Sequence, residues 1–310
     1  MPLGLWIVMG VVVAAVLFAL DRLALAMIRP PKKIHARNID RLAKAYSVRP
    51  HSFRSLGQEL QGWFVEPRDG GGKSGRAGVV PGEPGGPGSA GLRAANHGPV
   101  AVLAHGWGSS HGRMTYLAEP LLEAGIPVFL FDIRRHGHSY DAPYVTARHF
   151  RDDTVAAVRE ARAAYPGRPL VLMGHSMGGS AAVLAVTERA PVDALVTVGA
   201  PADMWGVWAS YFDQKGLPGK WIVRCLSPFW RYRAGVPFPT LDPARRVKEM
   251  CVPFLIIHGN QDQSVPVSHA RILAEGARVE PVILGGEGHN DILGKPEVHE
   301  RVLAFVEDLG

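Results

Sequence analysis

The stretch PLVLMGHSMGGSAAVLAVTER (residues 169–189) decides the fold of this chain. It opens as a short apolar run, turns at Gly174-His175-Ser176-Met177-Gly178, and continues as an apolar helix-like segment. A G-x-S-x-G pattern between a buried strand and a helix is typical of a tight turn that presents the serine hydroxyl at the helix N-terminus. The sequence therefore predicts that Ser176 is a nucleophile.

Similar apolar runs recur on both sides of this stretch. They occupy residues 99–104, 127–132, 169–174, 193–199, 253–258 and 281–285, and a strand-like run precedes them at 60–67. Helix-like segments lie between them at about 113–125, 152–165, 177–189, 267–276 and 296–308. Strands buried on both faces that alternate with helices indicate an α/β fold with a mostly parallel, doubly wound sheet.

A nucleophilic serine needs a base, and the base needs an acid that orients it. Asp262 and His289 each follow one of the later apolar runs, so both are expected at the carboxyl edge of the sheet, beside Ser176. The chain order Ser, Asp, His is the one expected for such a sheet. Glu287 and Asp291 are alternative acids.

The loop after the run 99–104 reads His105-Gly106-Trp107-Gly108. We expect the backbone N–H of Trp107, together with that of Met177, to bind the oxyanion, because backbone donors are fixed before the reaction begins. Their side chains would line the acyl pocket. We also expect His105, Gly106 and His175 to contribute to substrate binding.

Taken together, several motifs resemble the α/β-hydrolase superfamily, and most of all its branch of monoglyceride lipases, lysophospholipases and serine aminopeptidase-like proteins. They are His105-Gly106-Trp107, the run DIRRHGHS (132–139), Gly174 to Gly179, Asp262 ahead of Val265-Pro266, and Gly288-His289.

The resemblance covers about residues 60–310 and implies a serine hydrolase. It implies Ser176 as nucleophile, His289 as base and Asp262 as its orienting acid, with Trp107 and Met177 as oxyanion donors. One departure from the family pattern is an arginine at position 135, where relatives usually have glycine. The departure falls in a structural loop and leaves the three catalytic candidates intact.

The net charge of +6 is concentrated near the N-terminus. Residues 21–54 hold nine basic and two acidic residues, whereas the rest of the chain sums to −1. A basic strip joined to a neutral body indicates a membrane surface rather than a nucleic-acid partner.

An uncharged apolar run precedes the basic strip at residues 3–20. It is long enough to be an uncleaved membrane anchor, and a cleaved signal peptide and a buried core helix are alternatives. Ala24-Leu25-Ala26 resembles a cleavage site, but the basic residues follow the run instead of preceding it. Under the positive-inside rule this charge pattern predicts a single-pass anchor with the catalytic domain in the cytoplasm.

These features predict the domain organisation. We expect a transmembrane signal anchor at 1–21, a basic juxtamembrane segment at 22–55 and an α/β-hydrolase domain at 56–310. Within that domain, residues 68–98 are predicted to be a glycine-rich flexible surface loop and residues 203–247 a cap insertion. Four of the seven tryptophans lie in the cap, which we expect to roof an apolar pocket.

No metal or cofactor is expected. His136 and His138 resemble half of a metal site, but the fuller ligand sets of metallohydrolases are missing from the sequence. Cys225 and Cys251 are too few for a disulfide scaffold, and we expect them to be buried core thiols.

The predicted function is hydrolysis of carboxylic esters through an acyl-enzyme, with a lipid-like small-molecule substrate such as a monoacylglycerol or lysophospholipid. A thioesterase acting on acylated proteins or carriers is an alternative. A catalytically idle hydrolase fold used as a membrane-tethered binding module is another. We expect the membrane as a partner through the N-terminal helix and the basic strip, and no nucleic acid; the sequence does not identify whether there are protein partners.

Overall fold

The computed structural model describes residues 3–34, 39–68 and 98–309. The predicted glycine-rich loop at 68–98 therefore lies outside the described residues, apart from its two end positions. The described residues form a sheet of eight strands. In spatial order the strands are β1 (Ser47–Ser55), β2 (Gln58–Glu66), β4 (Val128–Phe131), β3 (Val100–Ala104), β5 (Leu170–His175), β6 (Ala194–Val198), β7 (Phe254–Gly259) and β8 (Val282–Leu284).

The sheet is mostly parallel, as the sequence predicts. Strands β3 to β8 run parallel to their neighbours, whereas β1 pairs antiparallel with β2 and β2 with β4. In the centre, Val102 pairs with Leu172 and Leu103 with Met173. Side chains alternate between the two faces of a strand, so Val102 and Leu172 enter one buried cluster and Leu103 and Met173 enter the other.

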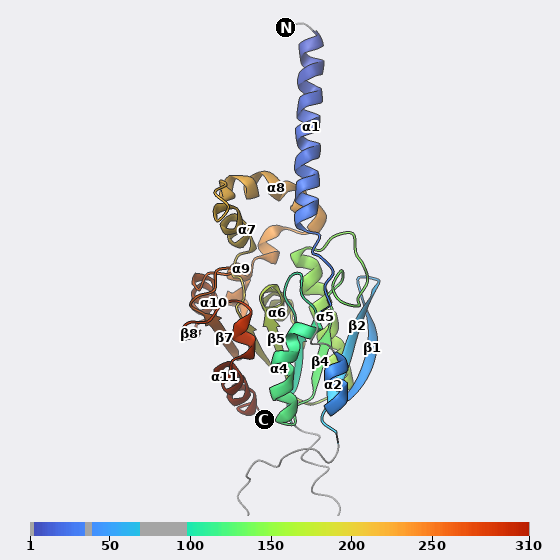
Figure 1. Ribbon diagram of the computed structural model, residues 1–310, viewed down its shortest axis with the longest axis vertical. Coiled ribbons are helices and arrows are strands. Elements are labelled where there is room, and N and C mark those ends of the chain that lie inside the picture. Colours follow the sequence, from blue (N-terminus) through green and yellow to red (C-terminus); the bar gives the residue numbers. More distant parts are fainter. Residues whose placement is uncertain (1–2, 35–38, 69–97, 310) are drawn as a thin grey trace, which may run out of the picture.

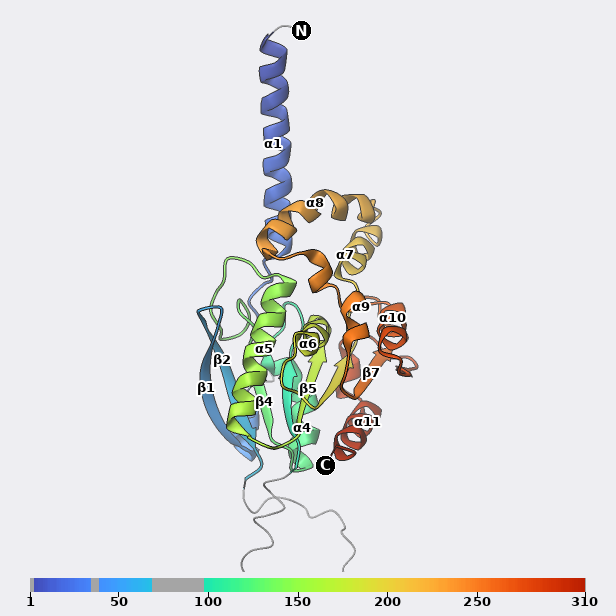
Figure 2. The same ribbon diagram turned by 180° about the vertical axis from the view of Figure 1, so that it is seen from behind.

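Helices cover both faces of the sheet (Figure 1, Figure 2). One face is covered by α5 (Ala147–Ala164), α6 (Met177–Thr187) and α10 (Ser268–Ala277). The other is covered by α2 (Ile39–Ala45), α4 (His111–Glu123) and α11 (Pro296–Glu307). The short 3-10 segment η3 (Asp291–Gly294) precedes α11.

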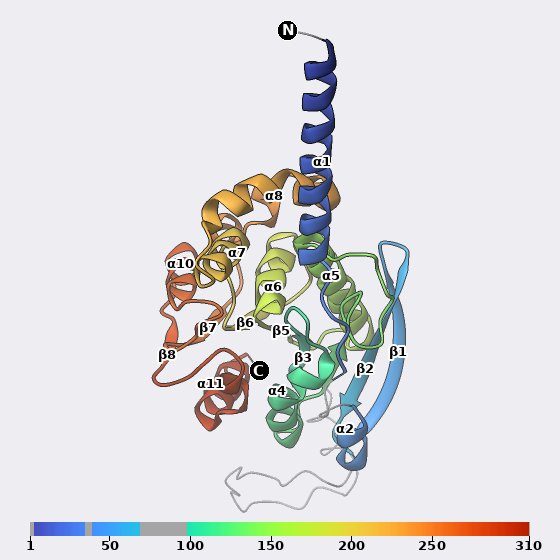
Figure 3. The ribbon, with the colours of Figure 1, turned by 45° about the horizontal axis from the view of Figure 1, so that its top comes forward.

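Between β6 and β7 the chain leaves the sheet and forms a helical cap. The elements of the cap are α7 (Met204–Asp213), α8 (Gly219–Ala234), η1 (Phe238–Leu241), α9 (Pro243–Arg246) and η2 (Val247–Glu249). The Asp203 carboxylate starts α7 by accepting the backbone N–H groups of Trp205 and Gly206 at 2.9 and 3.0 Å. Figure 3 shows α7 and α8 above the sheet, with α8 reaching the lower end of the first helix.

That first helix, α1 (Leu3–Met27), projects away from the rest of the molecule (Figure 1). Its most apolar window has a mean hydropathy of 2.7, and none of that window is buried. A buried core helix is therefore excluded, and length and composition allow α1 to cross a membrane. The helix continues six residues past position 21, where we expected the anchor to end.

Two other expectations need correction. The segment 22–55, predicted to be juxtamembrane, contains α2 and β1, so the sheet begins at Ser47 and not after residue 56. Because β1 is an edge strand with one largely exposed face, its sequence is polar and lacks the apolar signal of a buried strand. Cys225 and Cys251 are both exposed instead of buried, because each lies on an outward-facing position.

Candidate active site

Ser176 forms the sharp turn between β5 and α6. Its backbone has φ 54° and ψ −127°, a conformation that side-chain-bearing residues adopt only when their surroundings enforce it. The two flanking glycines are required by close backbone packing. A Cβ on Gly174 would lie 2.4 Å from the carbonyl oxygen of Gly178, and one on Gly178 would lie 2.2 Å from that of Ala104. The turn therefore holds the serine hydroxyl in one fixed direction.

The structure brings Ser176, His289 and Asp262 into one hydrogen-bonded chain. Ser176 Oγ lies 2.9 Å from His289 Nε2, and His289 Nδ1 lies 2.6 Å from Asp262 Oδ2. Of the alternative acids, Glu287 forms an ion pair with Lys295 at 2.9 Å. This arrangement lets the imidazole take a proton from the serine while the carboxylate fixes its tautomer.

The Asp262 carboxylate is held by more than the His289 imidazole. Its Oδ1 accepts the backbone N–H groups of Ser264 and Val265 at 2.9 and 2.8 Å. A second imidazole, that of His258, lies 3.4 Å from Oδ2 and 2.8 Å from the Val265 carbonyl oxygen. Burial raises the pKa of Asp262, but the hydrogen bonds from His258 and His289 outweigh burial and hold this pKa well below its usual range. The carboxylate is therefore ionised at neutral pH.

Sequence reasoning missed His258. The residue ends the apolar run 253–258, lies four positions before Asp262 and stands next to last in β7. The side chain is fully buried. The sequence signal that could have identified it is a polar residue at the carboxyl end of a buried strand.

Two backbone N–H groups near Ser176 are free to bind an oxyanion. Among the described residues, neither Trp107 nor Met177 donates its backbone N–H to a protein acceptor. Gly106 brings the Trp107 loop against the nucleophile, since a Cβ on Gly106 would lie 2.9 Å from Ser176 Cβ and 3.4 Å from its Oγ. Both N–H groups are therefore available as the kind of donors that an oxyanion hole uses.

The run DIRRHGHS (132–139) holds the loop that contains Trp107 and Gly108 in place. His136 Nε2 accepts the backbone N–H of Gly108 at 3.0 Å, and its Nδ1 donates to the Arg134 carbonyl oxygen at 2.9 Å. Burial lowers the pKa of His136 to about 4, so the imidazole is neutral and can accept. Arg135 has φ 61°, in the left-handed region that favours glycine, which explains why its family position is usually glycine.

His136 thus acts as a hydrogen-bond acceptor within the loop. Within the part of the chain that the structure describes, no group of three or more His, Cys, Asp or Glu side chains is arranged to hold a metal ion.

The structure corrects the prediction that His105 and His175 bind substrate. Both imidazoles are buried behind the site, with 0% and 2% of their surface exposed. His105 donates to the Gly106 carbonyl oxygen and accepts the backbone N–H of Ile133, whereas His175 donates to the His289 carbonyl oxygen at 2.9 Å. Burial lowers the pKa of each to about 3, so both are neutral supports of the catalytic loops.

A cavity of about 350 Å³ opens over Ser176. Ser176 and His289 lie on its floor, and the side chains of Trp107, Met177 and Trp208 form an apolar wall. A narrower apolar cavity continues from this wall beneath the cap and contains Trp205 and Trp230. The aromatic side chains of the cap therefore cover the site, as the sequence predicts for the cap insertion.

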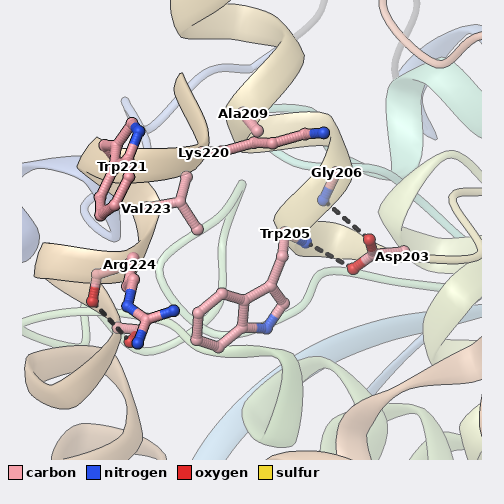
Figure 4. Close-up of a pocket in the computed structure, with 9 residues that line it drawn as sticks. Asp203, Trp205, Gly206, Ala209, Lys220, Trp221, Val223 and Arg224 are labelled. Atoms are coloured by element: carbon pink, nitrogen blue, oxygen red, sulfur yellow. Dashed lines mark hydrogen bonds between the residues drawn. The ribbon is translucent and has the colours of Figure 1, made fainter. Parts of the chain in front are cut away.

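The cap contains a larger cleft of its own, of about 580 Å³. Figure 4 shows Lys220, Trp221 and Arg224 of α8 on one side of it and Trp205 of α7 on the other. Of the residues that the structure describes, none lines both this cleft and the cavity over Ser176. The cleft lies outside the reacting centre.

Comparisons with known proteins agree with this geometry. The family model "Serine aminopeptidase, S33" matches residues 95–231. The monoglyceride lipase homolog of Monkeypox virus is 36% identical over 242 residues, covering 67% of this chain and 87% of the viral protein. The monoacylglycerol lipase of Mycolicibacterium smegmatis is 27% identical over 219 residues, covering 60% of this chain and 78% of that protein. Among solved structures, an esterase of Pyrococcus furiosus superposes with a TM-score of 0.67 at 20% identity, covering 91% of this chain and 98% of the esterase.

Proposed function

The chain belongs to the α/β-hydrolase superfamily, in its monoglyceride-lipase-like branch, and on that premise we propose that it is a membrane-anchored hydrolase of lipid-like esters. As a member of this branch it is a serine hydrolase that acts on esters. We propose monoacylglycerols or lysophospholipids as the substrate class. The observation that carries the proposal is the hydrogen-bonded chain from Ser176 through His289 to Asp262, on the floor of an apolar cavity.

In the proposed mechanism, His289 Nε2 removes the proton of Ser176 Oγ as this oxygen attacks the ester carbonyl carbon. The backbone N–H groups of Trp107 and Met177 bind the resulting oxyanion. The alcohol leaves with the proton from His289, and an acyl-enzyme remains on Ser176. Water activated by His289 then attacks the acyl carbonyl, and the acid and the free serine are released.

The membrane part of the proposal rests on where α1 meets the cap. The apolar part of α1 spans about 27 Å at 1.5 Å per residue, close to the thickness of a bilayer core. At its end, the Asp21 carboxylate pairs with Arg233 of α8 at 2.7 Å. Helix α8 therefore lies at the level where α1 leaves the lipid. Its exposed side chains include Trp221 and Tyr232, residue types that favour membrane interfaces.

The basic residues after α1 place the catalytic domain on the cytoplasmic side in this proposal. Two reporters fused to the C-terminus test this topology, one active only in the cytoplasm and one active only outside it. We expect signal from the first alone. Signal from the second alone contradicts the proposed orientation.

Labelling with a fluorophosphonate probe tests the catalytic proposal. We expect the native protein in detergent to label, and Ser176→Ala at equal folded concentration not to label. A matched control is Ser180→Ala, since Ser180 lies one helical turn further along α6 and bonds the Pro201 carbonyl oxygen instead of a catalytic group. Equal labelling of native protein and Ser176→Ala contradicts the assigned nucleophile.

A substrate panel then tests the ester class. Matched oxygen and sulfur esters of the same acyl chain are compared by kcat/KM, together with monoacylglycerol and lysophospholipid. We expect the oxygen esters of long acyl chains to be preferred. Faster cleavage of every thioester contradicts the proposed substrate class, and a folded native protein that neither labels nor cleaves any ester contradicts catalysis altogether.

A further inference from the structure

The last turns of α1 are built into the cap instead of into the lipid. Ala24 is fully buried against α8. The last four carbonyl groups of a helix lack partners within it, and that of Ala24 accepts the indole N–H of Trp230 at 2.9 Å. The ion pair between Asp21 and Arg233 lies one turn earlier. The helix therefore has a fixed position relative to α8.

The first residue after α1, Ile28, lies in the wall of the narrow apolar cavity beneath the cap. Ile28 is 6% exposed, and its carbonyl oxygen accepts the backbone N–H of Val145 at 2.8 Å. Ile28 and Val145 both line the narrow apolar cavity beneath the cap. Trp107 and Met177, the two proposed oxyanion donors, line the same cavity. A residue at the end of the membrane helix thus faces the same space as the oxyanion loop.

This narrow cavity adjoins the cavity over Ser176, because both are lined by four common residues. These are Trp107, Met177, Met204 and Trp208. The polar side chains of Gln214 and Gln263 line only the cavity over Ser176. The apolar cavity is small, about 60 Å³, so an ester bound at Ser176 would place only part of its acyl chain there, towards Ile28, with its alcohol towards the glutamines.

We propose that Ile28 is a specificity-determining residue, which forms the end wall of the acyl site and limits the length of the acyl chain. The inference rests on the proposed function, since it concerns the substrate of the same site. It gives the helix a second role: α1 supplies a wall of the cavity in addition to an attachment to the membrane. A larger side chain at position 28 shortens the accepted chain, and a smaller one lengthens it.

The test uses the full-length protein in detergent with Ile28→Phe and Ile28→Ala. The matched controls are Leu23→Phe and Leu23→Ala, because Leu23 lies on the same helix but is 44% exposed. The substrates are p-nitrophenyl butyrate, octanoate, laurate and palmitate. Rates are divided by the concentration of sites that a fluorophosphonate titrates, so that unfolded protein does not contribute. The readout is the ratio of kcat/KM for palmitate to that for butyrate.

We expect Ile28→Phe to lower this ratio about tenfold or more, because a hydrophobic pocket discriminates single carbon groups by at least that factor. Ile28→Ala raises the ratio, and both Leu23 variants leave it unchanged. A purely structural role of Ile28 lowers all four esters by one common factor, and that result overturns the inference. An unchanged ratio in Ile28→Ala also overturns the inference. This second variant keeps the test valid if Ile28→Phe does not fold.

The outcomes separate this inference from the proposed function. In one outcome, the native protein cleaves the esters while both Ile28 variants show the same palmitate-to-butyrate ratio of kcat/KM as the native protein. That result overturns the role of Ile28 alone. A folded native protein that neither labels nor cleaves any ester overturns the proposed function, and the role of Ile28 falls with it.

Discussion

Replacing Gly106 with alanine places a methyl group against the nucleophile. The new Cβ would lie 2.9 Å from Ser176 Cβ and 3.3 Å from the carbonyl oxygen of His175. Carbon atoms in contact prefer about 3.5 Å or more, so the loop and the serine must separate by about 0.6 Å. The backbone of Gly106 does not have the positive φ that alanine avoids, so the effect arises from this contact alone.

The magnitude follows from the displacement. Overpacking of this size destabilises a protein by about 1–3 kcal/mol. A shift of 1 Å at a reacting centre costs about a hundredfold in rate, so we expect kcat of Gly106→Ala to fall about ten- to a hundredfold. The loss falls mainly on kcat because the shift moves Ser176 Oγ relative to His289 and the Trp107 N–H.

Two measurements are needed, urea unfolding and kcat on titrated sites. The control is Gly125→Ala, whose φ of 84° strains alanine but whose Cβ has no neighbour within 4 Å. It is expected to lose about 1 kcal/mol of unfolding free energy and no kcat. If Gly106→Ala keeps kcat within about twofold of the native value, the tight contact between this loop and Ser176 does not control the reaction.

Three further predictions follow from the supports of the site. Asp262→Asn is expected to lower kcat about 10⁴-fold, because an amide does not hold the catalytic tautomer of His289. Burial raises the pKa of Asp262, but hydrogen bonds from His258 and His289 outweigh burial and hold this pKa low in the folded protein. The ionised carboxylate therefore stabilises the fold above the unfolded pKa of about 3.9, and this stabilisation is lost as the pH falls below that value. Urea titrations of Asp262→Asn between about pH 5 and pH 2 should be flatter than those of the native protein, and equal slopes contradict this. His258→Leu leaves the buried Val265 carbonyl without its partner and should lower the unfolding free energy by about 1–3 kcal/mol; no change in urea midpoint contradicts this. Gly137→Ala should destabilise by about 3 kcal/mol or more, since its Cβ would lie 1.9 Å from an Asp132 carboxylate oxygen at a φ of 46°, and a loss below about 1 kcal/mol contradicts it.

The sheet was predictable because its central strands are continuous apolar runs. Strands β3, β5 and β6 are buried at every position, and a strand buried on both faces needs no polar alternation. Strand β1 was not predictable for the opposite reason. It lies at the edge of the sheet, where the exposed Arg54, and Arg49 with its guanidinium over the Phe64 ring, interrupt the apolar pattern.

The candidate site divides in the same way. The position of Ser176 follows from a local turn, which a motif describes completely. The choice among Asp262, Glu287 and Asp291 depends on which carboxylate reaches His289 across the sheet edge, and sequence spacing does not contain that distance. The roles of His105 and His175 depend on burial: His105 follows β3 and His175 ends β5, and both rings are buried and bond backbone groups instead of lining the cavity.

The end of α1 shows how a single charge can mark a change of environment. The uncharged run stops before Asp21, and a charge inside an apolar helix suggests that the helix ends there. In the structure Asp21 pairs with Arg233 of α8, and the helix continues past this ion pair to Met27. In these last two turns Ala24 is buried against α8, whereas Leu23 stays exposed. An ion pair at this position removes the penalty of an isolated charge next to the apolar run, and it holds the end of α1, with Ile28, against the cap.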